Sequence, residues 1–269
     1  MPRRARLPRA RRSRDPAIVG AARRAHRSGM STIHAMSTVH GVEIPNASAV
    51  AGLVDQQLGG GGVWSDPSDY TPIEGLERAI QAAGPLVPAF AAALVGLLGH
   101  ADLKRRAGAI ASLWKVAGHV SGDDVMKAFD AHPDRFRGVS MPAGYPDMGA
   151  DLEAALVMAL AQAGATGGSQ LQAFYRQHLN GPAKIWALLG LAAAAPDWVV
   201  AQARTVVPRR AIAGVVGKIP DRAHREALVR ALAPWGDDGN AVVASSAWTL
   251  LKLPDDEKAA LAAILQGRS

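Results

Sequence analysis

Apolar residues recur along most of this chain at the three- and four-residue spacing of an amphipathic α-helix, and the alternating pattern of β-strands is nearly absent. The clearest helix begins at Asp102 and carries Ile110, Leu113, Trp114 and Ala117 on one face. Small and large apolar residues, chiefly Ala and Leu, repeat in the same way elsewhere. The pattern therefore predicts an all-α fold.

Residues that start or stop helices separate these apolar segments. Thr71-Pro72-Ile73-Glu74 is a capping box with proline at the first helical position, and Gly84 is a natural C-terminal stop. Helices are expected at 46–58, 71–84, 86–98, 102–118, 121–130, 150–163, 169–179, 183–195, 198–212, 221–233, 241–252 and 255–265. Lone helices of about 10–16 residues are marginal in water, so packing between many short neighbours has to stabilise them.

Three segments look alike, and each places an Asp-containing turn before a helix of small and large apolar residues. They are HADLKRRAGAIASLWKV (100–116), APDWVVAQARTVV (195–207) and GDDGNAVVASSAWTLLKL (236–253). This pattern resembles the second half of a HEAT repeat, and the last two segments lie about 41 residues apart, within the period of such repeats. The resemblance, over roughly residues 72–265, implies a right-handed α-solenoid of HEAT-like helix pairs. An irregular helical bundle is the alternative fold.

The basic charge of the chain is concentrated at its N-terminus. Residues 1–35 contain ten Arg and one Asp, whereas residues 36–269 contain 20 Lys and Arg against 22 Asp and Glu. We therefore expect a disordered basic tail over 1–40, an N-terminal helix and Gly-rich linker over 41–71, and a helical repeat domain over 72–269. The tail is interpreted as an over-long start, with Met30 or Met36 as the first residue. A nucleic-acid arm, a targeting peptide and a contact with anionic membranes are the alternatives.

Motifs for covalent, metal and nucleotide chemistry are missing from the sequence. The chain has no cysteine, which removes thiolate nucleophiles and metal ligands and is compatible with a reducing cytoplasm. P-loop, dinucleotide and serine-hydrolase motifs are absent, as are His pairs spaced to bind a metal on one helix. The longest uncharged run, from Ala79 to Ala101, is too interrupted for a membrane span. We expect no cofactor, no metal and no membrane span.

A basic cluster within the otherwise neutral domain is one candidate binding surface. Region 204–230 holds seven basic residues against two carboxylates. The partner-binding candidates here are Arg204, Arg209, Arg210, Lys218, Arg222 and Arg225. On one face they would attract an acidic protein segment or a phosphate backbone, and the alternative is an ordinary solvated helical face.

The segment HPDRFRGVSMPAGYPDMG (132–149) is the other candidate, because it interrupts the helical pattern for longer than is usual in compact domains. Its candidates for contact with a partner are Arg135, Phe136, Arg137 and Tyr145. An inert insertion is the alternative interpretation.

The function expected from these features is a non-enzymatic protein-binding or adaptor module. The alternative is a nucleic-acid-binding or DNA-base-processing protein that uses the basic cluster. The alkylpurine DNA glycosylases that share the HEAT-like fold pair a Trp with an Asp one helical turn further on, and that match is not found here. Trp114, Trp186 and Trp248 lie on apolar stripes and are expected in the core, whereas Trp64, Trp198 and Trp235 fall at turns.

Overall fold

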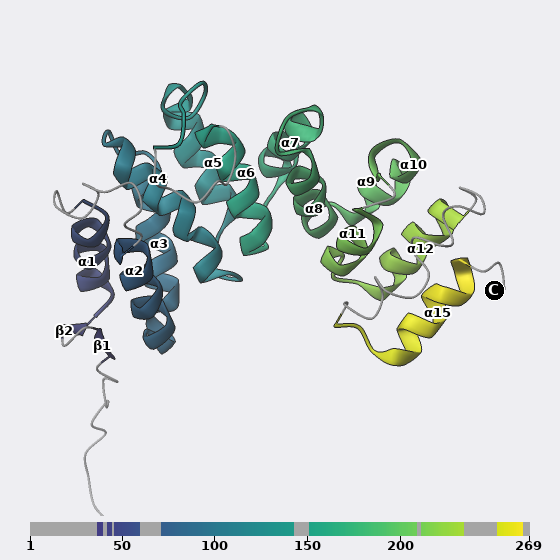
Figure 1. Cartoon of the computed structure of the whole chain (residues 1–269), viewed down its shortest axis with the longest axis horizontal. Helices are drawn as coiled ribbons and strands as arrows, with labels where there is room; N and C mark the ends of the chain where they lie inside the picture. The colour runs from purple at the N-terminus through teal and green to yellow at the C-terminus, as the bar shows by residue number, and fades with distance from the viewer. Residues whose placement is uncertain are drawn as a thin grey trace, which may run out of the picture. The chain divides into compact units, whose positions relative to one another are not determined.

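A computed structural model describes residues 37–39, 42–44, 46–59, 71–142, 151–208, 211–233 and 252–265. Nearly every described element is a helix, which confirms the all-α class (Figure 1). A short antiparallel hairpin that the sequence did not predict precedes the helices, and it joins β1 (Ser37–Val39) to β2 (Val42–Ile44). Strands of three residues are too short to leave a recognisable alternating pattern. Most of the predicted tail, the Gly-rich linker and the predicted helix 241–252 lie outside the described residues.

The helices follow one another through short turns. The first group is α1 (Ala47–Gly59), α2 (Thr71–Ala82), α3 (Val87–Leu97), α4 (Leu103–Ser112), α5 (Gly122–Ala131) and α6 (Leu152–Ala163). The second group is α7 (Ser169–Gln177), α8 (Lys184–Ala194), α9 (Pro196–Ala201), α10 (Ala203–Val206), α11 (Ile212–Lys218), α12 (Arg222–Leu232) and α15 (Asp255–Leu265). Single 3-10 turns are η1 (Gly84–Leu86), η2 (Leu113–Val116), η3 (Pro133–Arg135) and η4 (His178–Asn180).

Local hydrogen bonds explain where several helices begin and end. Asp102, Ser121, Asp151 and Asp221 each accept a backbone N–H from the first turn of α4, α5, α6 and α12, respectively. Gly164 ends α6 with a φ of 63°, a left-handed conformation that glycine adopts without steric cost. These boundaries agree with the sequence within a few residues.

Two predicted helices are interrupted. The helix expected from Asp102 to Gly118 changes to the 3-10 turn η2 at Leu113, and the helix expected over 198–212 is divided into α9 and α10 at Gln202. Helix α9 begins at Pro196, before the predicted start at residue 198, because proline favours the first helical position. The β-branched residues of α9 and α10 have low helix propensity, which favours the break between these helices. Pro208, shortly after the end of α10, prevents the helix from continuing.

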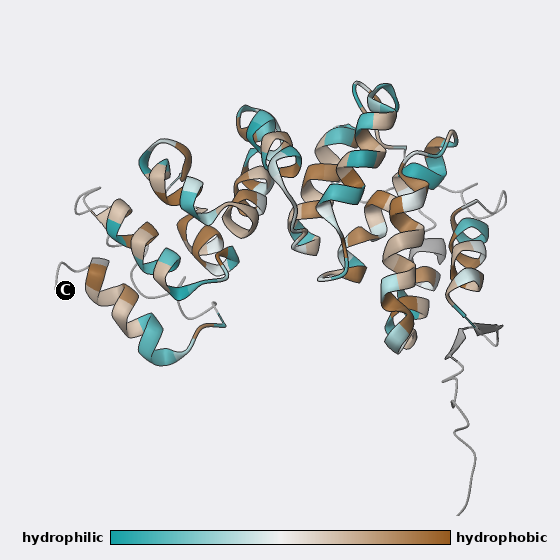
Figure 2. Ribbon diagram, turned by 180° about the vertical axis from the view of Figure 1, so that it is seen from behind, coloured by the Kyte–Doolittle hydropathy of each residue, from teal (hydrophilic) through white to brown (hydrophobic). Residues whose placement is uncertain are grey.

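Helices pack mainly against near neighbours along the chain. Among the best-packed pairs are α1 with α3, α3 with α4, α4 with α6, α6 with α8 and α8 with α11, and α12 packs against both α9 and α15 (Figure 1). A single cluster of buried apolar residues extends from Val50 of α1 to Ile264 of α15. The acidic first turn of α15 forms the hydrophilic end of the C-terminal helix in Figure 2.

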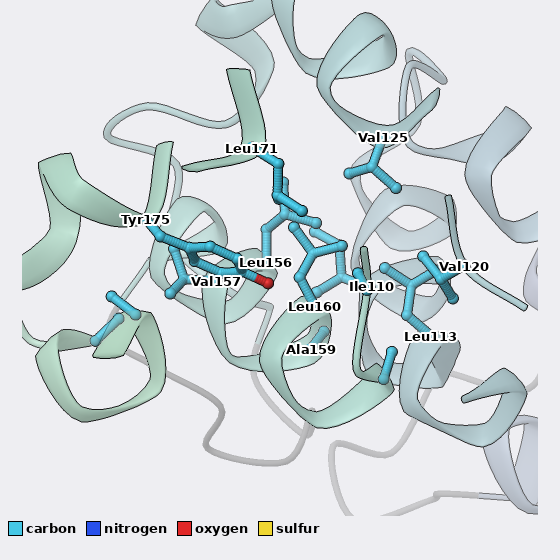
Figure 3. Packing of buried hydrophobic residues seen from close by; sticks show 14 of the residues in the cluster. Ile110, Leu113, Val120, Val125, Leu156, Val157, Ala159, Leu160, Leu171 and Tyr175 are labelled. Atoms are coloured by element: carbon cyan, nitrogen blue, oxygen red, sulfur yellow. The ribbon is translucent and has the colours of Figure 1, made fainter. Parts of the chain in front are cut away.

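Helix α6 lies at the centre of this core. Nine of its twelve residues are buried, and Leu156 and Leu160 lie among Ile110 of α4 and Leu171 and Tyr175 of α7 (Figure 3). A helix that is apolar on nearly all sides requires neighbours on all sides. None of the described helices is by itself long and apolar enough to cross a bilayer, although Gly75–Ala82 of α2 and the segment Gly84–Leu97 meet that test as a pair bent by 112°.

Trp114 corrects one prediction about the core. Its side chain is the only exposed large hydrophobic one among the described residues, at 42% exposure, and the Lys115 ammonium lies 3.4 Å from its ring centroid. The change to a 3-10 turn at Leu113 rotates the following side chains relative to the apolar face of α4, because such a turn has three residues rather than 3.6. Trp186 and Trp198 are half-buried against the core. Trp64, Trp235 and Trp248 lie outside the described residues.

Candidate functional site

Two hydrogen bonds hold the starts of α5 and α7 side by side. The Gly122 N–H donates to the Thr166 carbonyl at 2.8 Å, and the Gly168 N–H donates to the Asp123 carboxylate at 2.7 Å. A Cβ atom at Gly122 would overlap the Leu171 side chain, so glycine permits this close approach. The contact fixes the position of α7 relative to α5 and creates the surface described next.

A hollow of about 160 Å³ lies between these two helices. We call it the α5–α7 hollow. It is lined by Met126, Phe129 and Asp130 of α5, by Arg137, and by Gln170, Ala173, Phe174 and Gln177 of α7.

Aromatic rings form the base of the α5–α7 hollow. Phe129 and Phe174 are 3% and 4% exposed, and their ring centroids are 5.1 Å apart at an interplanar angle of 60°. Phe136 also packs against Phe129, and their ring centroids are 5.1 Å apart. Tilted rings at such distances attract one another through their quadrupoles. The base is therefore a closely packed apolar surface.

Phe136 corrects a prediction about the 132–149 segment. This ring is predicted to lie at a contact surface, but the side chain is fully buried. The η3 turn directs it toward Phe129, so it supports the base of the hollow from within. Tyr145, the last candidate in that segment, lies outside the described residues.

Arg137 brings a positive charge to the rim of the hollow. Its side chain is 58% exposed, and its guanidinium lies 5.4 Å from the Phe129 ring centroid, within the range of a cation–π contact. Its Nε is 3.8 Å from a Glu153 carboxylate oxygen, which is longer than a hydrogen bond. That same oxygen lies 3.3 Å from His178 Nε2. Glu153 therefore faces two basic groups and holds Arg137 only loosely.

Two amide side chains complete the rim. Gln170, Ala173, Phe174 and Gln177 are spaced at i, i+3, i+4 and i+7, so they form one stripe along α7. Both glutamines are exposed. Gln172 lies off this stripe and donates to the Ala194 carbonyl at 3.2 Å instead. A glutamine–aromatic–glutamine stripe next to an amphipathic helix is the signal by which the sequence could have revealed this site.

Arg135 points away from the hollow. It donates to the Gly99 carbonyl, and the neighbouring Arg106 donates through Nη1 to the carbonyls of His100 at 2.7 Å and Ala101 at 2.8 Å. These carbonyls follow the C-terminus of α3, where positive side chains are favourable. Burial and the nearby Arg135 charge lower the pKa of Arg106. Both arginines therefore cap α3, and among the segment's described candidates only Arg137 lines the hollow.

The described members of the basic cluster are engaged with separate elements rather than gathered on one free face. Arg204 Nε donates to the Ala231 carbonyl at 3.0 Å, and the Lys218 ammonium lies 3.3 Å from the Ala161 carbonyl. A second hollow of about 280 Å³ adjoins Arg204 and is lined by residues 200–205 and Ala231. Its one charged side chain is already bonded to that carbonyl, so this hollow is a weaker candidate site.

Two further arginines of the cluster, Arg222 and Arg225, pair with carboxylates. Arg222 lies 3.0 Å from both Glu226 and Asp256. Arg225 is largely buried and makes two bonds of 2.5 and 3.0 Å to Glu257, which is itself 2% exposed. This bidentate pair corrects the expectation that Arg225 faces a partner, because its side chain joins α12 to α15 instead. Arg209 and Arg210 lie outside the described residues.

His224 joins α12 to α9. Its Nε2 lies 2.7 Å from an Asp197 oxygen and its Nδ1 lies 2.8 Å from an Asp221 oxygen. The hydrogen bonds to Asp197 and Asp221 raise the pKa of His224, and those from His224 lower the pKa of Asp221. Over the described ranges, no group of three or more His, Asp or Glu side chains is placed to hold a metal ion.

No protein-family model, curated protein or solved structure matches this chain. The resemblance to HEAT repeats therefore stays a prediction that rests on the sequence pattern.

Proposed function

We propose that this chain is a non-enzymatic adaptor that binds a segment of another protein at the α5–α7 hollow. The observation that carries the proposal is a small hollow with an aromatic base, an exposed guanidinium and two exposed amides on its rim. Aromatic residues and arginine are enriched in protein interfaces and supply much of their binding energy. Gln170 and Gln177 add hydrogen-bonding groups that can orient a bound chain.

A right-handed α-solenoid of HEAT-like helix pairs is the proposed arrangement of the helices, and an irregular bundle is the alternative. The preference of each helix for near neighbours along the chain supports it, because the units of a repeat protein contact only adjacent units. Such arrays expose extended surfaces suited to protein binding. The reducing cytoplasm is the proposed compartment and is compatible with the cysteine-free sequence.

Affinity capture with the full chain tests this function. The bait is compared with an Arg137→Ser, Gln177→Ala double variant in nuclease-treated lysate of the source organism. Arg78→Ser with Gln56→Ala is the matched control, because both residues are exposed and belong to α2 and α1. We expect a defined set of proteins that the wild type and the control retain and the hollow variant loses.

Two results would contradict the proposal. Capture that is identical for all three baits would show that the hollow does not bind the partner. Capture seen only in a parallel lysate without nuclease would favour the nucleic-acid alternative, since phosphate contacts depend on basic residues such as those of region 204–230. Circular dichroism of each variant checks that helical content is unchanged.

A further inference from the structure

We infer that the α5–α7 hollow recognises an extended peptide segment that carries one large apolar side chain next to an acidic residue. This inference rests on the proposed function and specifies the partner of the same site. Three features of the hollow lead to it: its size, the charge at its rim and the spacing of its two glutamines.

The size of the hollow fits one side chain. Its volume of about 160 Å³ is smaller than the roughly 300–1,000 Å³ of sites that enclose a whole drug-sized ligand. The base consists of Phe129, Phe174 and Met126, which are all nearly buried. Methionine is flexible and polarisable, and it adapts to different apolar groups. The hollow therefore favours a Leu, Met or aromatic side chain without demanding one of them.

The positive charge at the rim favours a partner segment with an acidic residue next to the inserted side chain. Among the described residues, Arg137 is the only basic side chain that lines the hollow, and its nearest carboxylate, Glu153, lies beyond hydrogen-bond distance. A partner carboxylate can accept two parallel hydrogen bonds from a guanidinium, which Glu153 does not do here. Asp130 also lines the hollow and is exposed. It repels a carboxylate on its own side, so the acidic residue of the partner has to lie on the Arg137 side.

The spacing of the two glutamines favours a partner whose main chain is extended. Gln170 and Gln177 are seven residues apart on α7, which is about 10.5 Å along the helix axis. Three residues of an extended chain span about the same distance. Each amide can donate to a carbonyl and accept from an N–H, so the pair can bond the main chain on both sides of the inserted side chain. A helical ligand has already paired these backbone groups and gains nothing from the amides.

Peptide display on the immobilised full chain tests this inference. A library of random twelve-residue peptides is selected against the wild type and depleted on the Arg137→Ser, Gln177→Ala variant. We expect enrichment of sequences with an acidic residue within two positions of Leu, Met or an aromatic residue. Enrichment of apolar residues at helical spacing would overturn the inference. Arginine-rich sequences, which match the chemistry of residues 1–35 of this chain, would do the same and would point to Asp130 as the anchor.

A charge exchange then tests the role of Arg137 directly. Binding of one enriched, fluorescein-labelled peptide is followed by fluorescence anisotropy. Arg137→Ser should weaken binding about tenfold or more, Arg137→Lys should restore part of the loss, and Arg78→Ser should have no effect. Arg137→Glu should bind a peptide whose acidic residue is replaced by Lys better than it binds the original. No preference after this exchange would overturn the inference.

The outcomes separate the two proposals. Proteins that are captured through the hollow, together with failure of every acidic–apolar peptide, would leave the adaptor function standing and reject the extended-peptide partner. Loss of both protein capture and peptide binding would reject both the adaptor function and the extended-peptide partner.

Discussion

Helices α6 and α12 are of similar length but contact their neighbours in different ways. Nine of the twelve residues of α6 are buried, compared with three of the eleven residues of α12. Helix α12 instead uses Arg222, His224 and Arg225 to reach carboxylates on α9 and α15 and within α12 itself. Burial of apolar area stabilises the centre at any pH, whereas ion pairs make the C-terminal part sensitive to pH and salt. Substitutions in and around these two helices test this contrast.

The largest effect is expected in the apolar centre. Leu160→Ala removes a fully buried side chain of α6 and leaves a cavity, so it should lower the free energy of unfolding by about 3 kcal/mol or more. Urea denaturation followed by circular dichroism measures this change. Leu160→Met is the control, because it conserves volume and should cost less than about 1.5 kcal/mol. Equal effects of the two substitutions would show that the centre of α6 is not tightly packed.

A somewhat smaller and local effect is expected in the C-terminal part. Glu257→Gln leaves Arg225 buried without a charge partner, which should destabilise the α12–α15 contact by about 3 kcal/mol. Hydrogen exchange should then show lost protection in α15 and unchanged protection in α6. Asp255→Asn is the control, because its pair with Lys258 is exposed and should contribute nothing measurable. A loss of protection spread over both helices would contradict the separation of the two parts.

A pH-dependent effect is expected at His224. Its folded-state pKa is raised, so the stability it contributes is fully present below its unfolded value of about 6.5 and is lost as pH rises through the raised pKa. Thermal melts between pH 5 and pH 9 should show the transition of the C-terminal part falling over this window. His224→Gln should flatten the dependence, whereas His119→Gln, at an exposed turn, should keep it. An unchanged pH profile in His224→Gln would contradict the role of this bridge.

Asp221 supplies the opposite sign in the same bridge. Hydrogen bonds from His224 lower its pKa, so its contribution is present above about pH 4 and is lost as pH falls through the lowered value. The His224 bridge should therefore contribute most to stability between about pH 4 and about pH 6.5.

The smallest effect is expected at Tyr175. Its hydroxyl is buried and has no hydrogen-bond partner among the described residues, and burial raises its pKa. Tyr175→Phe should therefore leave stability unchanged or raise it by up to about 1 kcal/mol, because an unpaired buried polar group is removed. Calorimetry of the two proteins measures the difference. A clear loss of stability would show that the hydroxyl makes a stabilising bond.

Local signals predicted the helices well because their causes are local. Asp102, Ser121 and Gly164 act within one turn of the helix ends that they determine, and a single sequence contains that information. The prediction that Trp114 lies in the core was wrong for a related reason, since a change of helix type within its own segment shifted the apolar face.

The stripe along α7 is a local signal, but the hollow itself depends on contacts between residues that are distant in the sequence. The hollow exists because Gly122 meets Thr166, 44 positions later, and Arg225 turns inward because Glu257 lies 32 positions away. Region 204–230 therefore looked like a free basic surface, although Arg204, Arg222 and Arg225 already form hydrogen bonds or ion pairs. Arg137 is exposed, as contact with a partner would require, but the aromatic base beneath it comes from two separate helices.

The preference of each helix for near neighbours also bears on how the chain folds. Contacts at short sequence separation close small loops, which costs little entropy, and proteins rich in such contacts fold rapidly. The helices from α1 to α8 can pack as they are synthesised, before α12 and α15 have emerged. The acidic start of α15 then supplies the last partner that the buried guanidinium of Arg225 requires.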